Sequence, residues 1–373
     1  MIIGFDAKRI FDNATGLGSY GRSLVHNLIK WYPQHDYRLF VHQDYYLPSP
    51  YKYQDFIDKT VTSTHFLPNL WRSTEIAKDI LKNKIEIYHG LSSELPFSLP
   101  TQVKSIVTVH DLIYEKFQDD FPLLDRSIYR YKVKRACKES SAIVAVSEST
   151  RRDLVELYKV PQEKIFVIYP SWGREYEYEY SSWFGELLKQ KYAIPFQFVL
   201  FVGTISHRKN LKIVIDALSY PENSELPLVI VSQGGNMSEE IERYIENKEV
   251  KHRCFFLDDV PWYELPGLYR AARCVVYPSL YEGFGLPVIE SLKMETPAVI
   301  SDNSSLREAG GDAVIYADAK DTEAWASAIN RVVLDTTLRD DLIAKGKEYI
   351  KRFEPAVVTT AMMDIYSWVH DQK

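Results

Sequence analysis

The stretch Cys274-Val-Val-Tyr-Pro-Ser-Leu-Tyr-Glu-Gly-Phe-Gly-Leu-Pro-Val-Ile-Glu-Ser-Leu-Lys-Met294 decides how this sequence is interpreted. It opens with an apolar run that indicates a buried strand ending at Pro278, and a loop with two glycines follows. Pro287 suits the first turn of a helix, because its missing N–H would have no partner there anyway. The segment therefore predicts a strand, a loop and the N-terminus of a helix.

The loop before this helix is suited to an anion. Gly283 and Gly285 let the backbone approach a ligand closely. The amides of Phe284, Gly285 and Leu286 are expected to point at whatever lies above the end of the strand, where the helix dipole favours negative charge. We therefore predict that this loop binds a diphosphate group.

Two carboxylates flank the predicted anion site. Glu282 precedes the loop, and Glu290 lies one turn inside the helix, where we expect its side chain at the surface of the site and outside the core. Carboxylates repel phosphate but accept hydrogen bonds from hydroxyl groups. They suit the two ends of a nucleotide sugar, one on the ribose diol and the other on the hexose. The alternative is that both are solvated charges that complement the start of a helix.

Outward from this segment, short apolar runs rich in β-branched residues alternate with longer amphipathic stretches along the whole chain. This alternation is typical of α/β proteins, and most of the runs are apolar on both faces, as parallel strands covered by helices should be. The predicted strands are 2–6, 38–42, 85–89, 105–110, 142–147 and 165–169 in the first half, and 198–203, 227–232, 254–257, 274–278, 298–301 and, at an edge, 313–316 in the second.

A chain of 373 residues exceeds the size of one hydrophobic core, so two domains are expected. Each half has the strands for a complete doubly wound domain. We predict an N-terminal, acceptor-side Rossmann-like domain over 1–170, a linker over 171–195 and a C-terminal, nucleotide-sugar-binding Rossmann-like domain over 196–355. The last helix, over 356–373, follows the final strand, and helices in this position often pack back across a domain boundary.

Composition excludes several classes of protein. The formal charge is −6 and no basic face is clustered enough to indicate a nucleic-acid-binding protein. The apolar runs are far shorter than the roughly 20 residues that cross a bilayer, and the first residues carry no signal sequence. The three cysteines are widely spaced without a C-x-x-C pair, so neither a disulfide framework nor a zinc site is indicated. A cytoplasmic protein is expected.

A second segment, Phe201-Val-Gly-Thr-Ile-Ser-His-Arg-Lys-Asn210, carries a basic pair. Arg208 and Lys209 follow a buried strand and precede a helix predicted over 210–218, so both cations lie near another helix N-terminus. Two positive groups can offset a diphosphate leaving group without a metal, and no carboxylate cluster calls for Mg²⁺. The alternative is an exposed basic pair in an ordinary turn.

His110 and Asp111 close a strand in the first half, at the edge where ligands gather in open α/β sheets. For His110, a ligand contact and a capping role in a turn both fit the residue type. We interpret Asp111 as a structural cap.

The segment Thr15-Gly-Leu-Gly-Ser-Tyr-Gly-Arg22 fits the dinucleotide pattern G-x-G-x-x-G at Gly16, Gly18 and Gly21. In that pattern the first glycine follows its strand at once, whereas here about ten residues intervene after Asp6. We predict a flexible loop whose amides face a substrate, before a helix that begins near Tyr20. A helix start without a ligand is the alternative.

Several of these segments resemble one family. From Glu282 to Glu290 the chain resembles the E-x7-E motif of the retaining glycosyltransferases of family 4, whose GT-B fold has two facing Rossmann-like domains. The basic segment resembles the G-T-x-x-x-R-K-N form of the donor-phosphate loop in bacterial mannosyltransferases. Thr108-Val-His-Asp-Leu112 is similar to the segment whose histidine approaches the donor sugar, and the glycine segment at Thr15 to the first loop of the family. Thr204 departs from the pattern, because many relatives have Arg there.

This resemblance, which covers about residues 1–355, implies a retaining, metal-independent hexosyltransferase with no cofactor and a GDP- or UDP-linked sugar as co-substrate. Its implied catalytic residues are His110, Glu282, Arg208 and Lys209. Its implied donor-binding residues are Gly16, Gly18, Gly203, Arg208, Lys209, Glu282, Gly283, Phe284, Gly285, Leu286 and Glu290. The Arg-Lys-Asn loop favours mannose from GDP-mannose, moved to a saccharide or lipid-linked saccharide in surface polysaccharide or glycolipid assembly. An NAD(P)-dependent oxidoreductase and a GT-B sugar-nucleotide epimerase are the alternatives.

A basic run without an acidic residue lies on a predicted helix of the first domain. Tyr129, Tyr131 and Val133 interleave with it. This face either contacts anionic lipid or a lipid-diphosphate acceptor at the inner leaflet of the cytoplasmic membrane, or it is an ordinary solvated helix face. The basic residues are Arg126, Arg130, Lys132, Lys134, Arg135 and Lys138.

Overall fold

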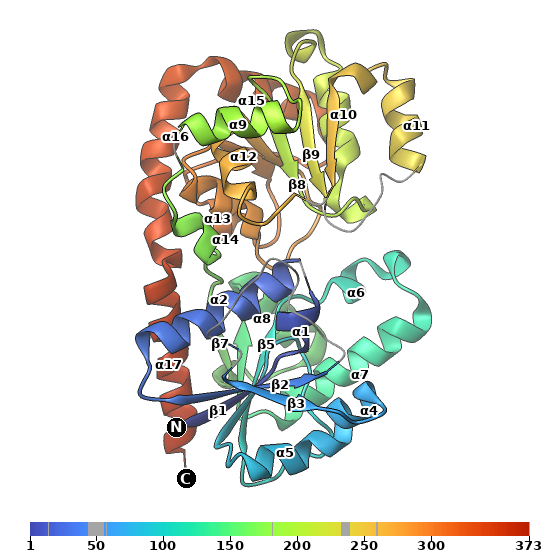
Figure 1. The fold of residues 1–373 in the computed structure, drawn as a ribbon. Coiled ribbons are helices and arrows are strands. Elements are labelled where there is room, and N and C mark those ends of the chain that lie inside the picture. Colours follow the sequence, from blue (N-terminus) through green and yellow to red (C-terminus); the bar gives the residue numbers. More distant parts are fainter. Residues whose placement is uncertain are drawn as a thin grey trace. The chain divides into compact units, whose positions relative to one another are not determined.

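A computed structural model divides the chain into two compact units (Figure 1). Unit 1 comprises Met1–Gly173 and Phe353–Lys373, and unit 2 comprises Arg174–Arg352. The structure describes residues 1–13, 15–43, 56, 58–180, 182–232, 239–258 and 260–372. Within these residues no helix combines the length and the apolar composition that a membrane span requires.

Unit 1 is built on a sheet of seven parallel strands, counted over the described residues, in the order β3-β2-β1-β4-β5-β6-β7. Strands β4, β5 and β6 are almost wholly buried, because helices cover both faces of the sheet. The strands are β1 Ile2–Asp6, β2 Asp36–His42, β3 Thr60–Ser63, β4 Ile87–Gly90, β5 Lys104–Val109, β6 Ala142–Ala145 and β7 Ile165–Val167.

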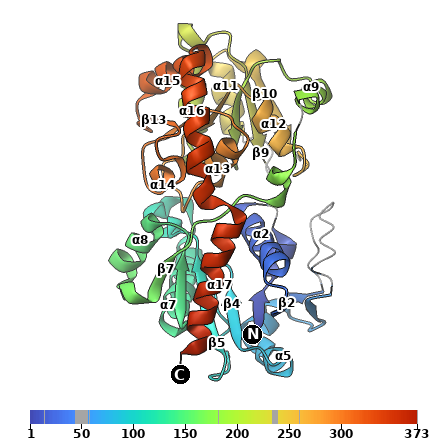
Figure 2. The same cartoon turned by 90° about the vertical axis from the view of Figure 1, so that its left-hand side faces the viewer.

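Helices α1, α2 and α17 pack on one face of this sheet, and α17 runs beside α2 and β4 (Figure 2). Leu24 of α2 and Met362 of α17 share an apolar core there with Ile3 and Phe5 of β1. Helices α5, α7 and α8 pack on the other face. The helices of unit 1 are α1 Lys8–Asp12, α2 Gly16–Trp31, α4 Pro68–Leu70, α5 Ile76–Lys82, α6 Ile113–Lys116, α7 Leu123–Glu139, α8 Glu148–Tyr158 and α17 Pro355–Asp371.

Unit 2 repeats the plan with six parallel strands among its described residues, in the order β10-β9-β8-β11-β12-β13. The strands are β8 Val199–Val202, β9 Leu228–Ser232, β10 Cys254–Asp258, β11 Cys274–Tyr277, β12 Ala298–Ser301 and β13 Ile315–Ala317. The helices are α9 Ser182–Lys191, α10 Leu211–Leu218, α11 Glu239–Asn247, α12 Leu265–Ala271, α13 Leu286–Lys293, α14 Leu306–Gly310, α15 Thr322–Leu334 and α16 Thr336–Tyr349.

The predicted pair of doubly wound α/β domains is confirmed. Every predicted strand overlaps an observed one, and β13 lies at an edge as expected. Strand β3 was not predicted. Its sequence Thr-Val-Thr-Ser lacks an apolar run, because the strand lies half-exposed at the edge of its sheet.

The division between the units differs from the predicted linker over 171–195. It falls between Gly173 and Arg174, and the following residues pack as part of unit 2, where α9 lies against α12. Residue 181 of the predicted linker lies outside the described residues. The last helix, α17, belongs to unit 1, since Met362, Tyr366 and Val369 are fully buried in that core.

Each sheet has one point at which the strand order reverses. In unit 1 the reversal lies between β1 and β4, and in unit 2 between β8 and β11. In open α/β sheets the loops at the carboxyl ends of such a strand pair diverge to opposite faces and leave a crevice where ligands bind. These two strand pairs therefore position the sites described below.

Candidate functional site

In unit 2 the reversal point brings together the two loops that the sequence singles out. Arg208 and Lys209 follow β8, and Glu282 follows β11, the neighbouring strand. The loops are joined directly, because the amide of Leu280 donates to the carbonyl of Arg208 at 2.8 Å. Asn210, in a left-handed conformation with φ of 54°, donates through Nδ2 to the carbonyl of Pro278 at 3.2 Å. The basic pair therefore lies in the loop next to the glycine loop.

The basic pair converges on one carboxylate. Glu282 Oε1 accepts a hydrogen bond from Lys209 Nζ at 2.6 Å and lies 2.6 Å from Arg208 Nη1. Lys209 also donates to the Tyr277 hydroxyl at 2.6 Å, and Arg208 to the carbonyl of Tyr281 at 2.7 Å. Lys209 and Glu282 are both buried. The alternative of an exposed basic pair in an ordinary turn therefore does not hold, because both cations belong to a hydrogen-bonded cluster.

The charge balance of this cluster is positive. Burial alone would raise the pKa of Glu282, but the adjacent Lys209 and Arg208 charges outweigh burial and hold the pKa at about 2. Glu282 is therefore a carboxylate at any pH near neutrality. Within this cluster two cations face one carboxylate, next to the N-terminus of α13. Such a place favours an anion.

Hydrogen bonds from Ser305 hold the loop between Glu282 and α13 in place. Ser305 Oγ donates to the carbonyls of Glu282 and Phe284 at 2.9 and 2.7 Å. Gly285 has a φ of +129°, and a Cβ added there would lie 2.8 Å from Leu306 Cδ2, so the position requires glycine. Among the described residues the amides of Gly285 and Leu286 donate no hydrogen bond, as expected for the first turn of a helix.

Glu290 is placed differently from the prediction. We expected its side chain at the surface of the site, but Glu290 is buried, and its Oε2 accepts a hydrogen bond from the Tyr269 hydroxyl at 2.8 Å. Tyr176 packs on Tyr269 with ring centroids 6.0 Å apart, and burial together with the Glu290 charge raises the pKa of Tyr176 well above its usual range. Glu290 is buried because α13 turns its side chain inward, toward α12 and the segment that follows the unit boundary.

The surroundings of Glu290 favour its protonated form. Burial is the main cause and the nearby Glu175 charge adds to it, while the Tyr269 hydrogen bond opposes both; the pKa is raised to about 7. The two glutamates of one short segment therefore differ in charge state near neutrality, because one faces two cations and the other faces two phenols.

In unit 1, His110 follows β5 at the carboxyl edge of the sheet. Its Nε2 donates to the carbonyl of Leu91 at 2.8 Å, and the Tyr20 ring packs edge-on at 4.8 Å. Burial lowers the pKa of His110 to about 4, so the ring is neutral and Nδ1 carries a lone pair without a partner among the described residues. The side chain of Asp111 accepts from the amide of Ile113 at 3.1 Å, which is the predicted capping contact.

The glycine segment of unit 1 is not the predicted open loop. Helix α2 begins at Gly16 and not near Tyr20. The amide of Gly18 donates to Asn13 Oδ1 at 3.1 Å, and a Cβ on Gly18 would lie 1.9 Å from the Asn13 carbonyl oxygen. Because α1 packs closely on α2, Gly18 and Gly21 serve that contact, and the match to a dinucleotide fingerprint has this structural origin. Gly16 is exposed at the start of the helix.

Sequence reasoning missed the tyrosines that surround both glutamates. Tyr277 is the last residue of β11, directly before the loop, and this position in the strand could have been noticed. Tyr269 lies on α12, and Tyr176 lies just after the unit boundary, where no local signal distinguishes either from the many other tyrosines of the chain.

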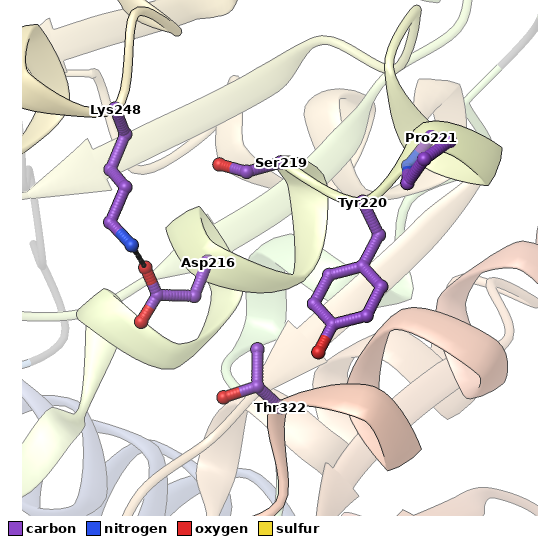
Figure 3. A pocket seen from close by; sticks show the side chains of 6 residues that line it. All are labelled: Asp216, Ser219, Tyr220, Pro221, Lys248 and Thr322. Carbon is purple, nitrogen blue, oxygen red and sulfur yellow. Dashed lines mark ion pairs between the residues drawn. The ribbon is translucent and has the colours of Figure 1, made fainter.

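A hollow elsewhere in unit 2 holds none of the predicted site residues (Figure 3). Its charged groups are already satisfied, because Lys248 pairs with Asp216 at 2.7 Å and the Tyr244 hydroxyl also donates to Asp216. We assign no ligand to it. Its lining residues are Asp216, Ser219, Tyr220, Pro221, Lys248 and Thr322.

Known proteins match both units. Residues 15–171 match the model of "Glycosyltransferase Family 4", and residues 186–349 match that of "Glycosyl transferases group 1". The chain is 30% identical over 285 residues to O-antigen chain mannosyltransferase B of Escherichia coli, covering 75% of this chain and 74% of the relative. It is 27% identical over 257 residues to the O-antigen chain mannosyltransferase RfbU of Salmonella typhimurium, covering 69% and 67%.

Solved structures share the fold. A sucrose-phosphate synthase from Thermosynechococcus elongatus superposes with a TM-score of 0.76 at 17% identity, over 99% of both chains. HepE of Anabaena, in complex with UDP and glucose, gives 0.73 at 16% identity, over 98% of this chain and 99% of that one. The predicted GT-B architecture is confirmed by these likenesses.

The burial of Glu290 predicts an effect on stability. Because folding raises the pKa of Glu290, this residue contributes its full stabilisation below the unfolded pKa of 4.5. The contribution is lost as pH rises through the folded pKa of about 7. Glu290→Gln removes this loss. We expect the variant to gain about 1–3 kcal/mol of unfolding free energy relative to the parent between pH 4.5 and pH 8, measured by urea denaturation. Glu323→Gln, at an exposed position, should show no such trend, and a Glu290→Gln difference independent of pH would contradict the assignment.

Proposed function

Because this chain belongs to the family 4 glycosyltransferases, we propose that it moves mannose from GDP-mannose to a saccharide or lipid-linked saccharide in surface polysaccharide assembly. The observation that carries the proposal is the ion cluster of Lys209, Glu282 and Arg208 at the reversal point of unit 2. The names of the O-antigen mannosyltransferases among its relatives support mannose as the sugar. The same relatives support the proposed role in surface polysaccharide assembly.

The cluster suits a diphosphate leaving group. Lys209 and Arg208 bring two positive charges, shared by the carboxylate of Glu282, to the loop before α13, and Glu282 keeps both cations in place before a ligand arrives. Charge placed in advance in this way stabilises a departing diphosphate without reorganisation during the reaction. In this proposal the cations do the work that a divalent metal does elsewhere, so no metal is required.

Glu290 suits the ribose of the donor. A charged carboxylate can accept hydrogen bonds from both hydroxyls of a ribose diol, whereas the protonated form offers a donor in place of one acceptor. Because the pKa of Glu290 is raised to about 7, donor affinity in this proposal increases as pH rises through neutrality. In unit 1, the lone pair on Nδ1 of neutral His110 can accept a hydrogen bond from a hydroxyl of the transferred sugar.

Donor binding tests the proposal directly. Among GDP-mannose, UDP-glucose and UDP-N-acetylglucosamine, we expect GDP-mannose to stabilise the protein most, by about 2.7 kcal/mol at 100 times its dissociation constant, read as a thermal shift. Lys209→Met should weaken GDP-mannose binding at least about tenfold, because a charge-assisted hydrogen bond to phosphate is lost. Lys212→Met is the control, since Lys212 pairs with Glu240 at the surface. A larger shift with either UDP-sugar would overturn the choice of donor.

Retention and metal independence form the next prediction. GDP-mannose carries an α-linked mannose, so retaining transfer should give an α-linked product, identified by the one-bond carbon–proton coupling of the new anomeric centre. Turnover should be unchanged in EDTA, because Arg208 and Lys209 supply the positive charge. A β-linked product rules out retention, and loss of turnover in EDTA that Mg²⁺ or Mn²⁺ restores rules out a metal-free site.

Neighbouring glutamates pair with three of the six residues in the basic run of α7. Arg130, Lys132 and Arg135 pair with Glu115, Glu94 and Glu139. The remaining solvent face of α7 carries Leu124, Ile128 and Tyr131 at helical spacing, 72%, 42% and 59% exposed. Exposed apolar side chains beside Lys134 and Lys138 fit a surface that rests on an anionic bilayer, and contact with such a membrane is the last element of the proposed function.

Vesicle sedimentation tests this contact. The parent should sediment with phosphatidylglycerol vesicles and much less with phosphatidylcholine vesicles, and added salt should weaken the association. Leu124→Ser combined with Ile128→Ser should remove most of it, whereas Leu334→Ser, an exposed apolar residue of unit 2, should not. Equal sedimentation of the parent and the double variant would leave α7 as an ordinary solvated helix.

A further inference from the structure

A chain of polar side chains runs through the apolar core of unit 1 and ends beside His110. The Tyr366 hydroxyl, on α17, lies 2.7 Å from Nδ1 of His89 on β4. Nε2 of His89 lies 2.8 Å from Oγ1 of Thr108 on β5. The Tyr20 hydroxyl, on α2, lies 3.1 Å from the same oxygen. The proposed function uses none of these four side chains.

The pairing of β4 with β5 brings this chain to the site. His89 is opposite Ile106 in the parallel ladder, and Ile106 belongs to the core that α2 and α17 cover. Because alternate residues of a strand share a face, Thr108 lies on the same face as Ile106. His110 comes two residues later, just past the end of the strand. Four segments that are far apart in the sequence therefore meet next to this histidine.

Tyr20 makes the contact with His110 itself. The two rings are nearly perpendicular, with an interplanar angle of 88° and centroids 4.8 Å apart. The other contact of the His110 ring is the hydrogen bond that Nε2 donates to the carbonyl of Leu91. The outer torsion of a histidine side chain has broad minima, so one hydrogen bond does not fix the plane of the ring. The direction of Nδ1 therefore depends on where Tyr20 is held.

The glycine segment fixes the helix that carries Tyr20. A Cβ on Gly21 would lie 2.9 Å from Ile10 Cγ1, so glycine lets α1 and α2 approach closely. Arg22, next along α2, donates through Nη1 to the carbonyls of Ile10 and Asn13 at 3.0 and 2.7 Å. The packing of α1 on α2 and the hydroxyl contact with Thr108 thus hold Tyr20 from two directions.

The energetics of the chain indicate a role in positioning. Tyr366, His89 and Thr108 are fully buried, and Tyr20 is 4% exposed. Burial, with a smaller effect of nearby His110, lowers the pKa of His89 to about 3, and burial raises the pKa of Tyr20 to about 12. The chain is therefore neutral near pH 7. Neutral buried hydrogen bonds add little more stability than apolar side chains of the same shape, but a connected network specifies one arrangement of the core.

We propose that Tyr20, His89 and Tyr366 are positioning residues for His110, which fix its ring so that the lone pair on Nδ1 meets a hydroxyl of the transferred sugar. Thr108 joins Tyr20 to His89, and Tyr366 brings α17 into the chain. The contact with the sugar rests on the proposed function, whereas the fixed orientation of the His110 ring does not.

The first test therefore uses no ligand. The histidine rings are labelled with ¹⁵N, and His110→Gln identifies the signals of His110. We expect the parent to show one neutral His110 ring with its proton on Nε2, as the hydrogen bond to Leu91 requires. Tyr20→Phe and Tyr366→Phe each remove one hydroxyl at opposite ends of the chain, and each should shift or broaden the His110 signals.

Tyr37→Phe is the matched control. Tyr37 is buried in the same core, but its hydroxyl donates to the carbonyl of Tyr32 at 2.9 Å and takes no part in the chain. This variant should leave the His110 signals unchanged. Thermal unfolding and circular dichroism identify the folded variants. Unchanged His110 signals in folded Tyr20→Phe or folded Tyr366→Phe overturn the proposal.

Conservative substitution of Thr108 separates the hydroxyl from the packing. Thr108→Val removes the oxygen that both Tyr20 and His89 contact, and it should change the His110 signals as the phenylalanine variants do. Thr108→Ser keeps the oxygen and loses a methyl group, and it should retain the parent signals. A changed signal in Thr108→Ser with a parent-like signal in Thr108→Val would show that packing alone matters, and it would overturn the chain.

The second test measures whether the chain acts through His110. Calorimetry compares GDP-mannose with GDP, which lacks the sugar. Tyr366→Phe should weaken GDP-mannose binding about fivefold, as expected for one neutral hydrogen bond, and leave GDP binding within about twofold. In the His110→Ala background, Tyr366→Phe should have no further effect on GDP-mannose, because residues that act through one group are not additive.

Two results of this comparison overturn the positioning role. One is equal weakening of GDP and GDP-mannose by Tyr366→Phe, which indicates a general loss of structure. The other is an unchanged effect of Tyr366→Phe in the His110→Ala background. If another nucleotide sugar binds better than GDP-mannose, the same comparison is made with it and its own nucleoside diphosphate. Failure of every nucleotide sugar to bind instead overturns the proposed function, and the ligand-free result on the His110 ring still stands.

Discussion

The ion cluster of Lys209, Glu282 and Arg208 is the constraint on which the loops at the reversal point of unit 2 depend. Buried charges are tolerated only when they are paired and hydrogen-bonded, and here each cation has a second partner, the Tyr277 hydroxyl or the Tyr281 carbonyl. Because the cations follow β8 and the carboxylate follows β11, the same interaction joins the loops of two adjacent strands. Removing Glu282 would leave the buried Lys209 and the largely buried Arg208 without their shared carboxylate and would remove one of the interactions that join the loops.

The second glutamate of the segment shows how far environment decides chemistry. Glu282 and Glu290 lie on one loop and the helix after it, yet their pKa values are about 2 and about 7. Lys209 and Arg208 keep Glu282 ionised, whereas burial makes Glu290 bind a proton near neutrality. The Glu290 carboxyl is therefore partly protonated near neutrality, and its burial costs more free energy as pH rises and the carboxylate forms.

Much of this arrangement could be predicted from the sequence, and the part that could not has a physical reason. Pro287 and the glycines located the helix N-terminus, and the basic pair after an apolar strand located its partner loop, because both signals are local. The burial of Glu290 could not be inferred, since it depends on Tyr269 and Tyr176 from distant segments. The glycine pattern misled for the same reason, because Gly18 and Gly21 pack against α1, a short element without a strong periodic signal.

The two units repeat one plan and differ where chemistry is concerned. Both sheets reverse their strand order next to a strand whose following loop carries a glutamate bound by an arginine and a lysine, Glu94 in unit 1 and Glu282 in unit 2. The difference is Asp6, a second carboxylate in unit 1, which pairs with Arg72. The same place in the fold therefore carries two carboxylates in unit 1 and one in unit 2, so the charged groups at the two reversal points differ although both sheets follow one plan.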